Sequence, residues 1–219
     1  MHNIVQNLVD IQNKIHSHLG EHKIDKVPKI IAVSKTFKIE KILPLVDHGH
    51  KDFGENKVQE AVDKWTEVKL SNPDIQLHLI GKLQTNKVKY AVKIFDYIHS
   101  VDSEKLAKKI SDEEIKINKK IKIFIQVNIG QEDQKSGTNL DELSSLISYC
   151  SEINLDVVGL MCIPPMNEDS EIYFEKMKKL NKENNFHELS MGMSSDYLKA
   201  ATNNASYLRV GSSIFGERY

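Results

Sequence analysis

Residues 121–127 read IKIFIQV, residues 140–150 read LDELSSLISYC, and residues 155–161 read LDVVGLM. Apolar residues alternate along the first stretch, as in a strand, and recur at helical spacing in the second. The third stretch is short and rich in aliphatic residues, as in a buried strand. A strand, a helix and a strand in this order predict a βαβ unit, whose two strands lie parallel. This part of the sequence therefore places the chain in the α/β class.

The same alternation runs through the whole sequence. An amphipathic helix over residues 3–19 comes first, and eight strand–helix units follow it. The predicted strands cover residues 30–33, 51–53, 75–80, 95–100, 121–127, 155–161, 188–190 and 207–210. The predicted helices cover residues 39–47, a segment that ends at residue 65, residues 86–92, 103–117, 140–150, 168–184 and 195–202, and a short segment at the end of the chain.

Eight units in one chain favour a single (β/α)8 TIM barrel with an extra N-terminal helix. An open, doubly wound sheet is the alternative, because periodicity does not report whether a sheet closes. Neither a linker nor a low-complexity stretch divides the sequence. We therefore expect residues 1–219 to form one domain.

Composition narrows the class of function. The chain has 219 residues, with 30 Lys and Arg against 31 Asp and Glu, and a formal net charge of −1. This balance argues against a nucleic-acid-binding protein, which would carry a basic face. No apolar run approaches the ~18 residues that span a membrane, and the first residues lack the pattern of a signal peptide. We therefore expect a cytoplasmic protein that binds neither nucleic acid nor a membrane.

Cysteine and histidine give no sign of a metal site. Cys150 and Cys162 are the only cysteines, too few for a disulfide framework or a four-cysteine zinc site. Both are flanked by apolar residues, so we expect two small buried side chains. The nine histidines show neither His-x-x-x-His nor Cys–His ligand spacing. His78 lies inside a predicted strand, where a hydrogen-bonded core histidine is the expected role.

One lysine stands at the end of the first predicted strand. In parallel barrels the active site lies at the carboxyl ends of the strands. Lys35 follows the apolar run 30–33, which would place its ammonium group near the mouth of a partly dry cavity. Desolvation lowers the pKa of a lysine, and a neutral amine condenses with an aldehyde. The alternative is a surface lysine at a strand end, because lysine is abundant in this chain.

Two later stretches have the residues of a phosphate site. Residues 190–196 read SMGMSSD after the seventh predicted strand, and residues 209–213 read RVGSS after the eighth. Barrels often bind phosphate at this pair of strands, where backbone N–H groups at a helix start are free. The alternative for each stretch is ordinary helix capping by Ser194 or Ser212. The occurrence of both stretches at the expected strands favours phosphate binding.

A strand-end lysine beside a phosphate site indicates a phosphorylated aldehyde held as a Schiff base. Pyridoxal 5′-phosphate (PLP) is one candidate, and the substrate of a class I aldolase is another. All but two of the 30 basic residues are lysine, and the two arginines are Arg209 and Arg218. Sites for PLP place a charged partner at the pyridine nitrogen, and Arg209 stands at the right strand for that role. An arginine there would keep the nitrogen unprotonated and weaken the ring as an electron sink; a structural ion pair is the alternative.

The chain resembles the pyridoxal phosphate homeostasis protein family, also described as proline synthetase co-transcribed homologues. The resemblance runs nearly end to end, in seven blocks that occur in the family's order. These blocks contain residues 32–36 (AVSKT); 53–56 (FGEN) with 58–60 (VQE); 78–81 (HLIG) with 83–84 (LQ) and 86–87 (NK); 134–137 (QKSG); 159–161 (GLM); 189–194 (LSMGMS); and 209–212 (RVGS) with 214–216 (IFG).

The resemblance implies a fold-type III barrel, like the N-terminal domain of alanine racemase without its second domain. It implies that Lys35 holds PLP as a Schiff base and that Arg209 lies at the pyridine nitrogen. It implies phosphate contacts from Ser194, Gly211 and Ser212, with Met193 beside them. Asn56, His78 and Met161 match family blocks around the cofactor, while no metal and no catalytic residue is implied.

The resemblance also implies a role in intracellular vitamin B6 homeostasis, as a carrier or regulator of PLP without demonstrable turnover. PLP itself and PLP-dependent apo-enzymes are the implied partners, and we expect a monomer or a weak dimer. A weak PLP-dependent amino-acid racemase is the first alternative, but racemisation needs two acid–base groups on opposite faces of the substrate carbon. In alanine racemase the second group is a tyrosine from the second domain of a partner chain, for which 219 residues leave no room. A Schiff-base lyase for a phosphorylated substrate is the second alternative.

Overall fold

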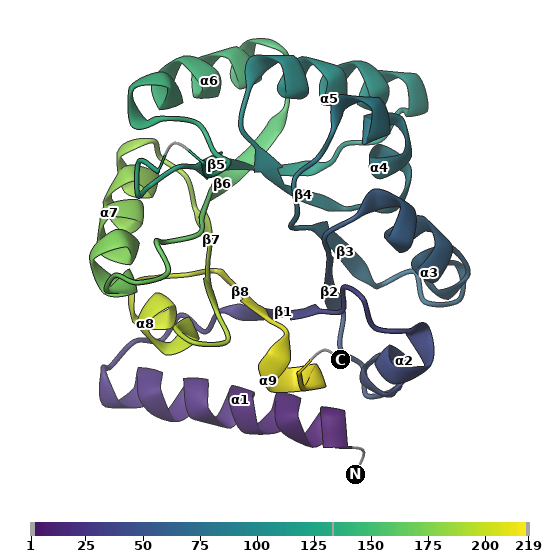
Figure 1. Cartoon of the computed structure of the whole chain (residues 1–219), viewed down its shortest axis with the longest axis vertical. Helices are drawn as coiled ribbons and strands as arrows, with labels where there is room; N and C mark the ends of the chain where they lie inside the picture. Colours follow the sequence, from purple (N-terminus) through teal and green to yellow (C-terminus); the bar gives the residue numbers. More distant parts are fainter. Residues whose placement is uncertain (1–2, 133, 218–219) are drawn as a thin grey trace.

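The computed structural model describes residues 3–132 and 134–217, and in it the strands close into a barrel (Figure 1). Each strand pairs in parallel with the next along the chain, and the last pairs with the first, with Arg209 opposite Ile31. The strands are β1 (Lys29–Val33), β2 (Asp52–Glu55), β3 (Gln76–Leu79), β4 (Tyr97–Val101), β5 (Lys122–Val127), β6 (Asp156–Cys162), β7 (Glu188–Met193) and β8 (Tyr207–Val210). The TIM barrel is confirmed, and the alternative of an open sheet is wrong.

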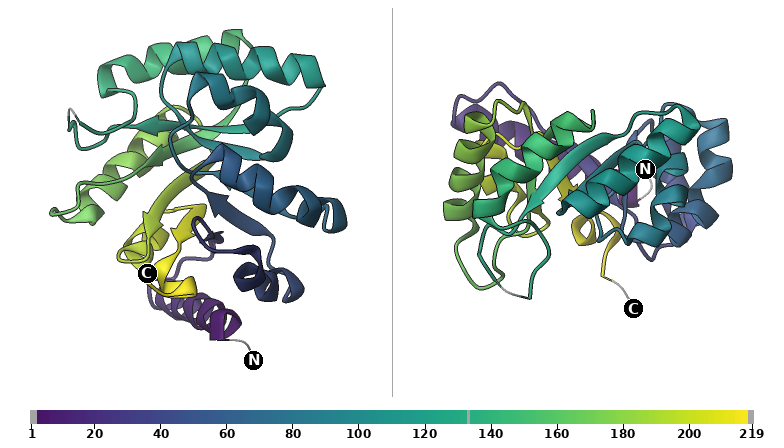
Figure 2. Two further views of the ribbon diagram at one scale, coloured as in Figure 1. Left: turned by 45° about the vertical axis from the view of Figure 1, so that its right-hand side comes forward. Right: turned by 90° about the horizontal axis from the view of Figure 1, so that it is seen from above.

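Helices connect the strands on the outside of this ring, as Figures 1 and 2 show. They are α1 (Asn3–Glu21), α2 (Ile39–Asp47), α3 (Val58–Ser71), α4 (Val88–Ile94), α5 (Glu104–Ile117), α6 (Leu140–Glu152), α7 (Ser170–Glu183), α8 (Tyr197–Thr202) and α9 (Ser212–Phe215), with a 3-10 turn, η1 (Thr85–Lys87), before α4. Because the helices cover the outer face and side chains fill the inner face, the strands are buried on both sides. This double burial explains the short, nearly continuous apolar runs in the sequence.

The predicted N-terminal helix is present as α1 and packs against α2, α8 and α9. Its apolar residues share one face, which is buried as expected from their helical spacing. These residues are Ile4, Val5, Leu8, Ile11, Ile15 and Leu19. The side-chain amide of Asn7 also donates a hydrogen bond of 2.9 Å to the carbonyl oxygen of Ile214 in α9. The helix α1 therefore holds α9, the short helix that follows β8, in place.

Two sets of strand residues form the core. Outward-facing residues such as Phe53 and Leu77 pack beneath the helices in one large cluster. Inward-facing residues fill the barrel and form a separate cluster of Ile31, Tyr97, Phe124, Met161 and Tyr207. A packed interior is usual for barrels of this size. The interior is therefore solid at mid-height, and space for a ligand lies only towards an end.

Strand β7 is longer than the sequence predicts. The prediction ends at Ser190, because the glycine that follows indicates a turn, but the strand continues to Met193. Gly192 adopts a positive φ of 84°, and the pairing of β7 with β8 shifts register between Ser190 and Met193. A Cβ at position 192 would lie 2.4 Å from the Cβ of Ala200. Glycine therefore permits a bulge here, and bulges commonly aim side chains at the rim of a barrel.

Two further expectations concern membranes and cysteines. Among the helices of the described residues, none has both the length and the apolar character needed to cross a bilayer. Cys150 and Cys162 are both buried and free, as expected. Burial raises the pKa of the Cys162 thiol to about 12, so this group stays protonated at neutral pH.

Candidate functional site

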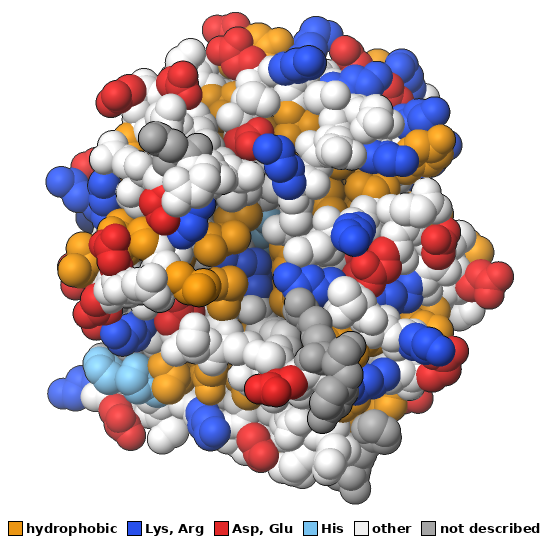
Figure 3. Space-filling view, in the orientation of Figure 1, with side chains coloured by type: hydrophobic (Ala, Val, Ile, Leu, Met, Phe, Trp, Pro, Cys, Tyr) orange, Lys and Arg blue, Asp and Glu red, His pale blue; other side chains and the backbone are white. Residues whose placement is uncertain are grey.

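A cavity of about 550 Å³ lies at the carboxyl ends of the strands. Its volume is within the range typical of small-molecule sites. In the view of Figure 3, basic side chains gather beside a hollow near the middle of the molecule. The cavity is lined by Val33, Lys35, Asn56, Ile80, Ile163, Met193, Ser194, Ser195, Arg209, Gly211, Ser212, Gly216 and Glu217.

Seven of the nine predicted site residues line this cavity. They are Lys35, Asn56, Met193, Ser194, Arg209, Gly211 and Ser212. They come from four separate parts of the sequence, at or just after the carboxyl ends of β1, β2, β7 and β8, and closure of the barrel brings these ends together.

The other two predicted residues, His78 and Met161, are absent from the cavity lining. Both are fully buried inside the barrel. The His78 ring is hydrogen-bonded to Asp52 and His99, as expected of a core histidine. Met161 belongs to the apolar cluster at mid-height. Their contact with a cofactor stays a prediction that rests on the resemblance alone.

Lys35 is the second residue after the end of β1, and its side chain is half-buried at the cavity. The next residue, Thr36, has a positive φ of 69°, which is uncommon for a residue other than glycine. Backbone bonds hold both sides of this turn: the N–H of Ser34 donates to the Gly54 carbonyl at 3.0 Å, and the N–H of Thr36 donates to the Glu60 carboxylate. The backbone of Lys35 is therefore fixed from both neighbours.

Three charged residues behind Lys35, namely Glu55, Glu60 and Lys64, form what we call the outer clamp. The Lys64 ammonium lies 2.9 Å from a carboxylate oxygen of each glutamate and donates to the Ser34 carbonyl at 3.0 Å. The Ser34 hydroxyl donates to Glu55 at 2.7 Å. The outer clamp thus connects the end of β1 to β2 and α3. Its charged groups lie on the outer side of the barrel wall, between the strands and α3.

Glu55 is the most buried member of the outer clamp. Its Oε1 accepts hydrogen bonds from Ser34, Lys64 and the Trp65 indole, the last at 2.9 Å. Burial nevertheless raises the pKa of Glu55 above its ordinary value, although the bonds from Trp65 and Lys64 act in the opposite direction. The positive charge of Lys64 therefore helps to keep this carboxylate ionised.

Arg209 points from β8 into the barrel and is only 5% exposed. Its Nη1 donates to the Ser190 hydroxyl at 2.7 Å, and its Nη2 donates to the Cys162 carbonyl at 2.8 Å. Burial lowers the pKa of Arg209, but a guanidinium remains charged in proteins. Among the described residues, no carboxylate forms an ion pair with Arg209. The alternative of a structural ion pair therefore finds no support in the described part of the chain. Arg218 lies outside the described residues.

The two predicted phosphate turns meet at the cavity. The N–H of Gly211 donates to the Ser194 hydroxyl at 3.3 Å, which joins the turn after β8 to the turn after β7. Ser194 does not cap α8, because that helix begins at Tyr197, two residues later than predicted. The N–H of Met193 donates to Asp196 at 2.7 Å and is occupied there.

The helix α9 has only four residues, so its dipole is weak, and hydroxyl and backbone N–H donors remain as the main means of binding an anion. Gly211 allows the turn to lie close to β1, because a Cβ there would come within 3.3 Å of the Val33 Cβ. Ser194, Gly211 and Ser212 therefore form one cluster of small donor residues at one side of the cavity.

Sequence reasoning missed the residues that support Lys35 and Arg209 from behind. Glu60 and Lys64 lie on α3, away from any strand end, and no strand-end rule selects them. His99 and Ser190 lie inside β4 and β7. The period of two along a strand carries the missing signal, because residues at alternate positions share the barrel interior.

The chain is similar to proteins of known families. The model of a family described as alanine racemase, N-terminal domain, matches residues 6–219. A pyridoxal phosphate homeostasis protein of Aquifex aeolicus is 39% identical over 200 residues, which cover 87% of this chain and 87% of that protein. The protein of the same name from Escherichia coli K12 is 32% identical over 231 residues, covering 100% of this chain and 98% of that protein.

Solved structures of related proteins have the same fold. PipY of Synechococcus elongatus PCC7942, solved with PLP bound, is 33% identical, with a TM-score of 0.81 over 92% of this chain and 100% of that chain. Alanine racemase of Clostridium difficile 630 is 16% identical, with a TM-score of 0.73 over 100% of this chain and 57% of that chain, and this likeness shows the fold alone. With a matching family model and relatives above 30% identity over nearly its whole length, the chain belongs to the family of pyridoxal phosphate homeostasis proteins, built on the barrel of the alanine racemase N-terminal domain.

Proposed function

We propose that this chain is a PLP-binding barrel domain that holds the cofactor as a Schiff base on Lys35. Its role is to carry or regulate PLP in intracellular vitamin B6 homeostasis, in the cytoplasm, as a monomer or weak dimer. The observation that carries this proposal is one cavity that contains a strand-end lysine, a buried arginine and a cluster of small donor residues. The names of the relatives and the PLP bound to PipY support it.

The residues at the cavity fit the three chemical parts of PLP. Ser194 and Ser212 offer hydroxyl donors for a phosphate, and the Gly211 N–H lies beside them, where it donates to the Ser194 hydroxyl. Lys35 offers the amine that condenses with an aldehyde. Arg209 offers a permanently charged donor for the pyridine nitrogen. When bound, PLP supplies the aldehyde and a ring that withdraws electrons from a bound amine.

The environment of Arg209 favours storage over catalysis. A guanidinium has only donor groups, so it binds the unprotonated form of a pyridine nitrogen. An unprotonated ring is a weaker electron sink, which disfavours proton removal from a bound amino acid. Ser190 and the Cys162 carbonyl keep Arg209 in this position.

A weak racemase remains the alternative, and one residue gives it a specific test. Glu217 is the only carboxylate among the described residues that line the cavity, and its side chain is exposed. A racemase would require a second acid–base group opposite Lys35. If the chain is a racemase, incubating it with one amino-acid enantiomer in deuterated water would place deuterium at the α-carbon of the amino acid and reduce its optical purity. Both effects would depend on Glu217. Absence of both supports the carrier role.

Absorbance of the purified protein tests the proposal. Titration with PLP is expected to give a yellow band that borohydride removes, and Lys35→Ala is expected to lose this band while its circular dichroism stays unchanged. Lys82→Ala is the matched control, because this exposed lysine follows the end of β3, two strands away from β1, and does not line the cavity. A Lys35→Ala protein that keeps a borohydride-sensitive band would contradict the proposal.

The carrier role needs a separate measurement. Loaded protein is mixed with a PLP-dependent apo-enzyme, in the presence of an aldehyde trap that consumes free PLP. Recovery of the enzyme's activity under these conditions indicates direct transfer. Recovery that disappears when the trap is added shows that the protein only releases PLP into solution, which would contradict a carrier.

A further inference from the structure

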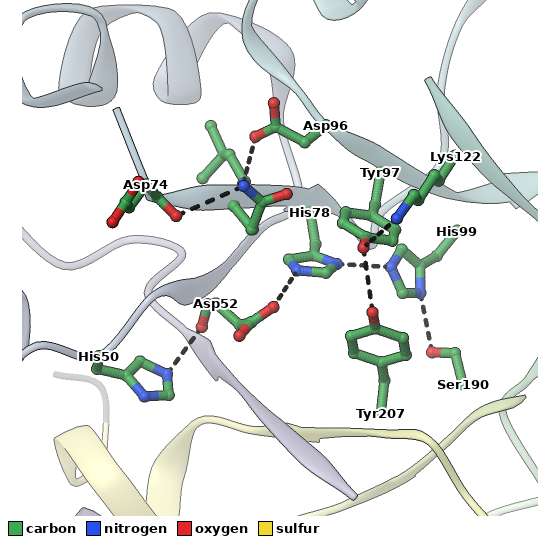
Figure 4. Close-up of polar contacts among 12 residues, drawn as sticks. His50, Asp52, Asp74, His78, Asp96, Tyr97, His99, Lys122, Ser190 and Tyr207 are labelled. Atoms are coloured by element: carbon green, nitrogen blue, oxygen red, sulfur yellow. Dashed lines mark hydrogen bonds and ion pairs between the residues drawn. The ribbon is translucent and has the colours of Figure 1, made fainter. Parts of the chain in front are cut away.

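A chain of buried polar side chains leads from Arg209 through the inside of the barrel, and Figure 4 shows the part of it from Ser190 to Asp52. Beyond the bond from Arg209 to Ser190, the Ser190 hydroxyl lies 2.9 Å from His99 Nδ1. His99 Nε2 lies 3.0 Å from His78 Nδ1, and His78 Nε2 lies 3.1 Å from Asp52 Oδ1. We call Asp52, His78, His99 and Ser190 the inner relay.

The inner relay connects the two ends of the barrel. Asp52 is the first residue of β2 and therefore lies at the end opposite the candidate cofactor cavity. Its side chain is 14% exposed and lines a second cavity of about 200 Å³ together with Lys29 and His50. Arg209, at the other end of the relay, lines the first cavity, whereas the four relay residues themselves do not.

Aromatic rings enclose the two histidines. The Tyr97 ring stacks on His78 with centroids 4.3 Å apart, and the Phe124 ring stacks on His99 at the same distance. Both histidines are fully buried, and burial lowers the pKa of His78 and, more strongly, that of His99. Burial acts to raise the pKa of Asp52, but the hydrogen bond from His78 and the neighbouring basic groups together outweigh burial, and the pKa is lowered. At neutral pH the relay therefore has two neutral imidazoles and one carboxylate.

Only one arrangement of protons satisfies all four hydrogen bonds. A carboxylate only accepts, so His78 donates from Nε2 and accepts at Nδ1. His99 must then donate from Nε2 and accept at Nδ1. The Ser190 hydroxyl therefore donates to His99 and presents its lone pair to Arg209, which only donates. Every bond points the same way, from Arg209 to Asp52.

We propose that the inner relay is a positioning device for Arg209, in which the carboxylate of Asp52 at the far end of the barrel fixes the direction of each hydrogen bond and so fixes the orientation of the guanidinium. The members are positioning residues, because only Arg209 reaches the cavity. This inference rests on the proposed function in one respect, namely that the orientation of Arg209 affects the binding of PLP.

The charge of Asp52 is what makes the direction unique. In Asp52→Asn the side chain keeps its size but gains an amide donor, so His78 can also accept at Nε2 and donate from Nδ1. His99 would then donate to Ser190, whose own proton would lose its acceptor. The variant thus allows the hydrogen bonds of the relay to run in two directions, where the natural chain allows one. The orientation of the Arg209 guanidinium is then less strictly fixed.

A double-mutant cycle on PLP affinity tests the relay. We expect Ser190→Ala to weaken PLP binding on the order of tenfold, as loss of an outer partner of a binding group does. Asp52→Asn should weaken it by a smaller factor, and should add nothing once Ser190→Ala is present. The matched control is Asp74→Asn, an exposed carboxylate at the same end of the barrel that pairs only with Lys51 among the described residues. Equal effects of Asp52→Asn with and without Ser190→Ala would overturn the proposal.

The guanidinium itself gives a readout that does not depend on PLP. Because the chain has only two arginines, arginine-specific ¹⁵N labelling yields two Nε signals. The apo-protein is expected to show separate, slowly exchanging Nη protons for Arg209, which merge in Ser190→Ala and in Asp52→Asn but not in Asp74→Asn. Unchanged Nη signals in both relay variants would overturn the proposal. If the natural chain does not bind PLP, the proposed function fails, and this spectrum still decides the relay.

Discussion

The two cations of the cavity are held in different ways. Behind Lys35, the outer clamp brings charges into direct contact, with Lys64 only 8% exposed and Glu55 fully buried. Behind Arg209, the inner relay has neutral histidines between the guanidinium and a carboxylate at the other end of the barrel. The outer clamp acts on the backbone around Lys35, whereas the inner relay acts on the Arg209 side chain.

The difference follows from what surrounds each network. Outside the barrel wall, α3 supplies Lys64 and Glu60 next to the end of β1, so an ion-pair cluster can form there. Inside the barrel, aromatic rings stack on both imidazoles, and burial lowers the pKa of each histidine. Both networks lie on the side of Lys35 or Arg209 that faces away from the cavity, and none of their carboxylates lines the cavity. The cavity therefore keeps its positive character, which suits a phosphate.

The largest effect is expected from breaking the outer clamp. Glu55→Ala leaves the buried Lys64 ammonium with only one carboxylate, Glu60, which is 24% exposed. Removing one partner of a buried pair costs about 3–5 kcal/mol. Urea unfolding should show this loss in the free energy of unfolding, and a smaller one in Glu55→Gln, which keeps an acceptor. A change below about 1 kcal/mol in Glu55→Ala would show that Glu60 alone is enough to stabilise the Lys64 ammonium.

A smaller effect is expected from breaking the inner relay. Ser190→Ala removes one hydroxyl and leaves a donor of Arg209 and an acceptor of His99 without their partner. Buried polar groups left unpaired cost about 1–3 kcal/mol. The same urea experiment measures this loss. If Ser190→Ala destabilises the protein more than Glu55→Ala does, the outer clamp is not the stronger of the two networks.

The pH dependence of stability separates the networks further. His99 has a lowered pKa in the folded protein, so below about pH 6.5 the unfolded chain takes up a proton that the folded chain does not. Stability from this group is present above the unfolded pKa and falls as the pH drops, by up to about 1.4 kcal/mol per pH unit. Between pH 7.5 and 5.5, the natural chain should lose about 1 kcal/mol more than His99→Gln does. Parallel stability curves for the two proteins would contradict a neutral, buried His99.

The smallest effect is expected at an exposed ion pair. Lys108 and Asp112 pair on the surface of α5, where both side chains are more than two-fifths exposed. Water and salt screen such pairs, so Lys108→Ala should leave the unfolding curve unchanged within error. A loss comparable to that of Ser190→Ala would mean that burial does not govern the strength of these networks.

Sequence periodicity predicts the barrel well because parallel strands buried on both faces are short and apolar. It fails at β7, where Gly192 resembles a turn and instead forms a bulge. The cavity is predictable as well, because Lys35, Arg209 and the Ser/Gly turns lie at or just after the ends of strands, and the carboxyl ends of the strands meet at one place.

The outer clamp and the inner relay could not be predicted from the sequence. Glu60 and Lys64 look like an ordinary i,i+4 pair on a helix, and only the packing of α3 on the barrel shows that they hold the end of β1. Asp52 and Ser190 are far apart in sequence and on different strands, so only closure of the barrel connects them through the histidines. The alternation of Tyr97 and His99 predicts a shared face but not a partner.

The central claim is that Lys35 holds PLP in this cavity. The most direct measurement is peptide mapping by mass spectrometry after PLP loading and borohydride reduction. We expect one pyridoxyl group per chain, on the peptide that contains Lys35, although lysine provides nearly all of the 30 basic residues. A pyridoxyl group spread over several surface lysines, or absent from Lys35, would contradict the claim.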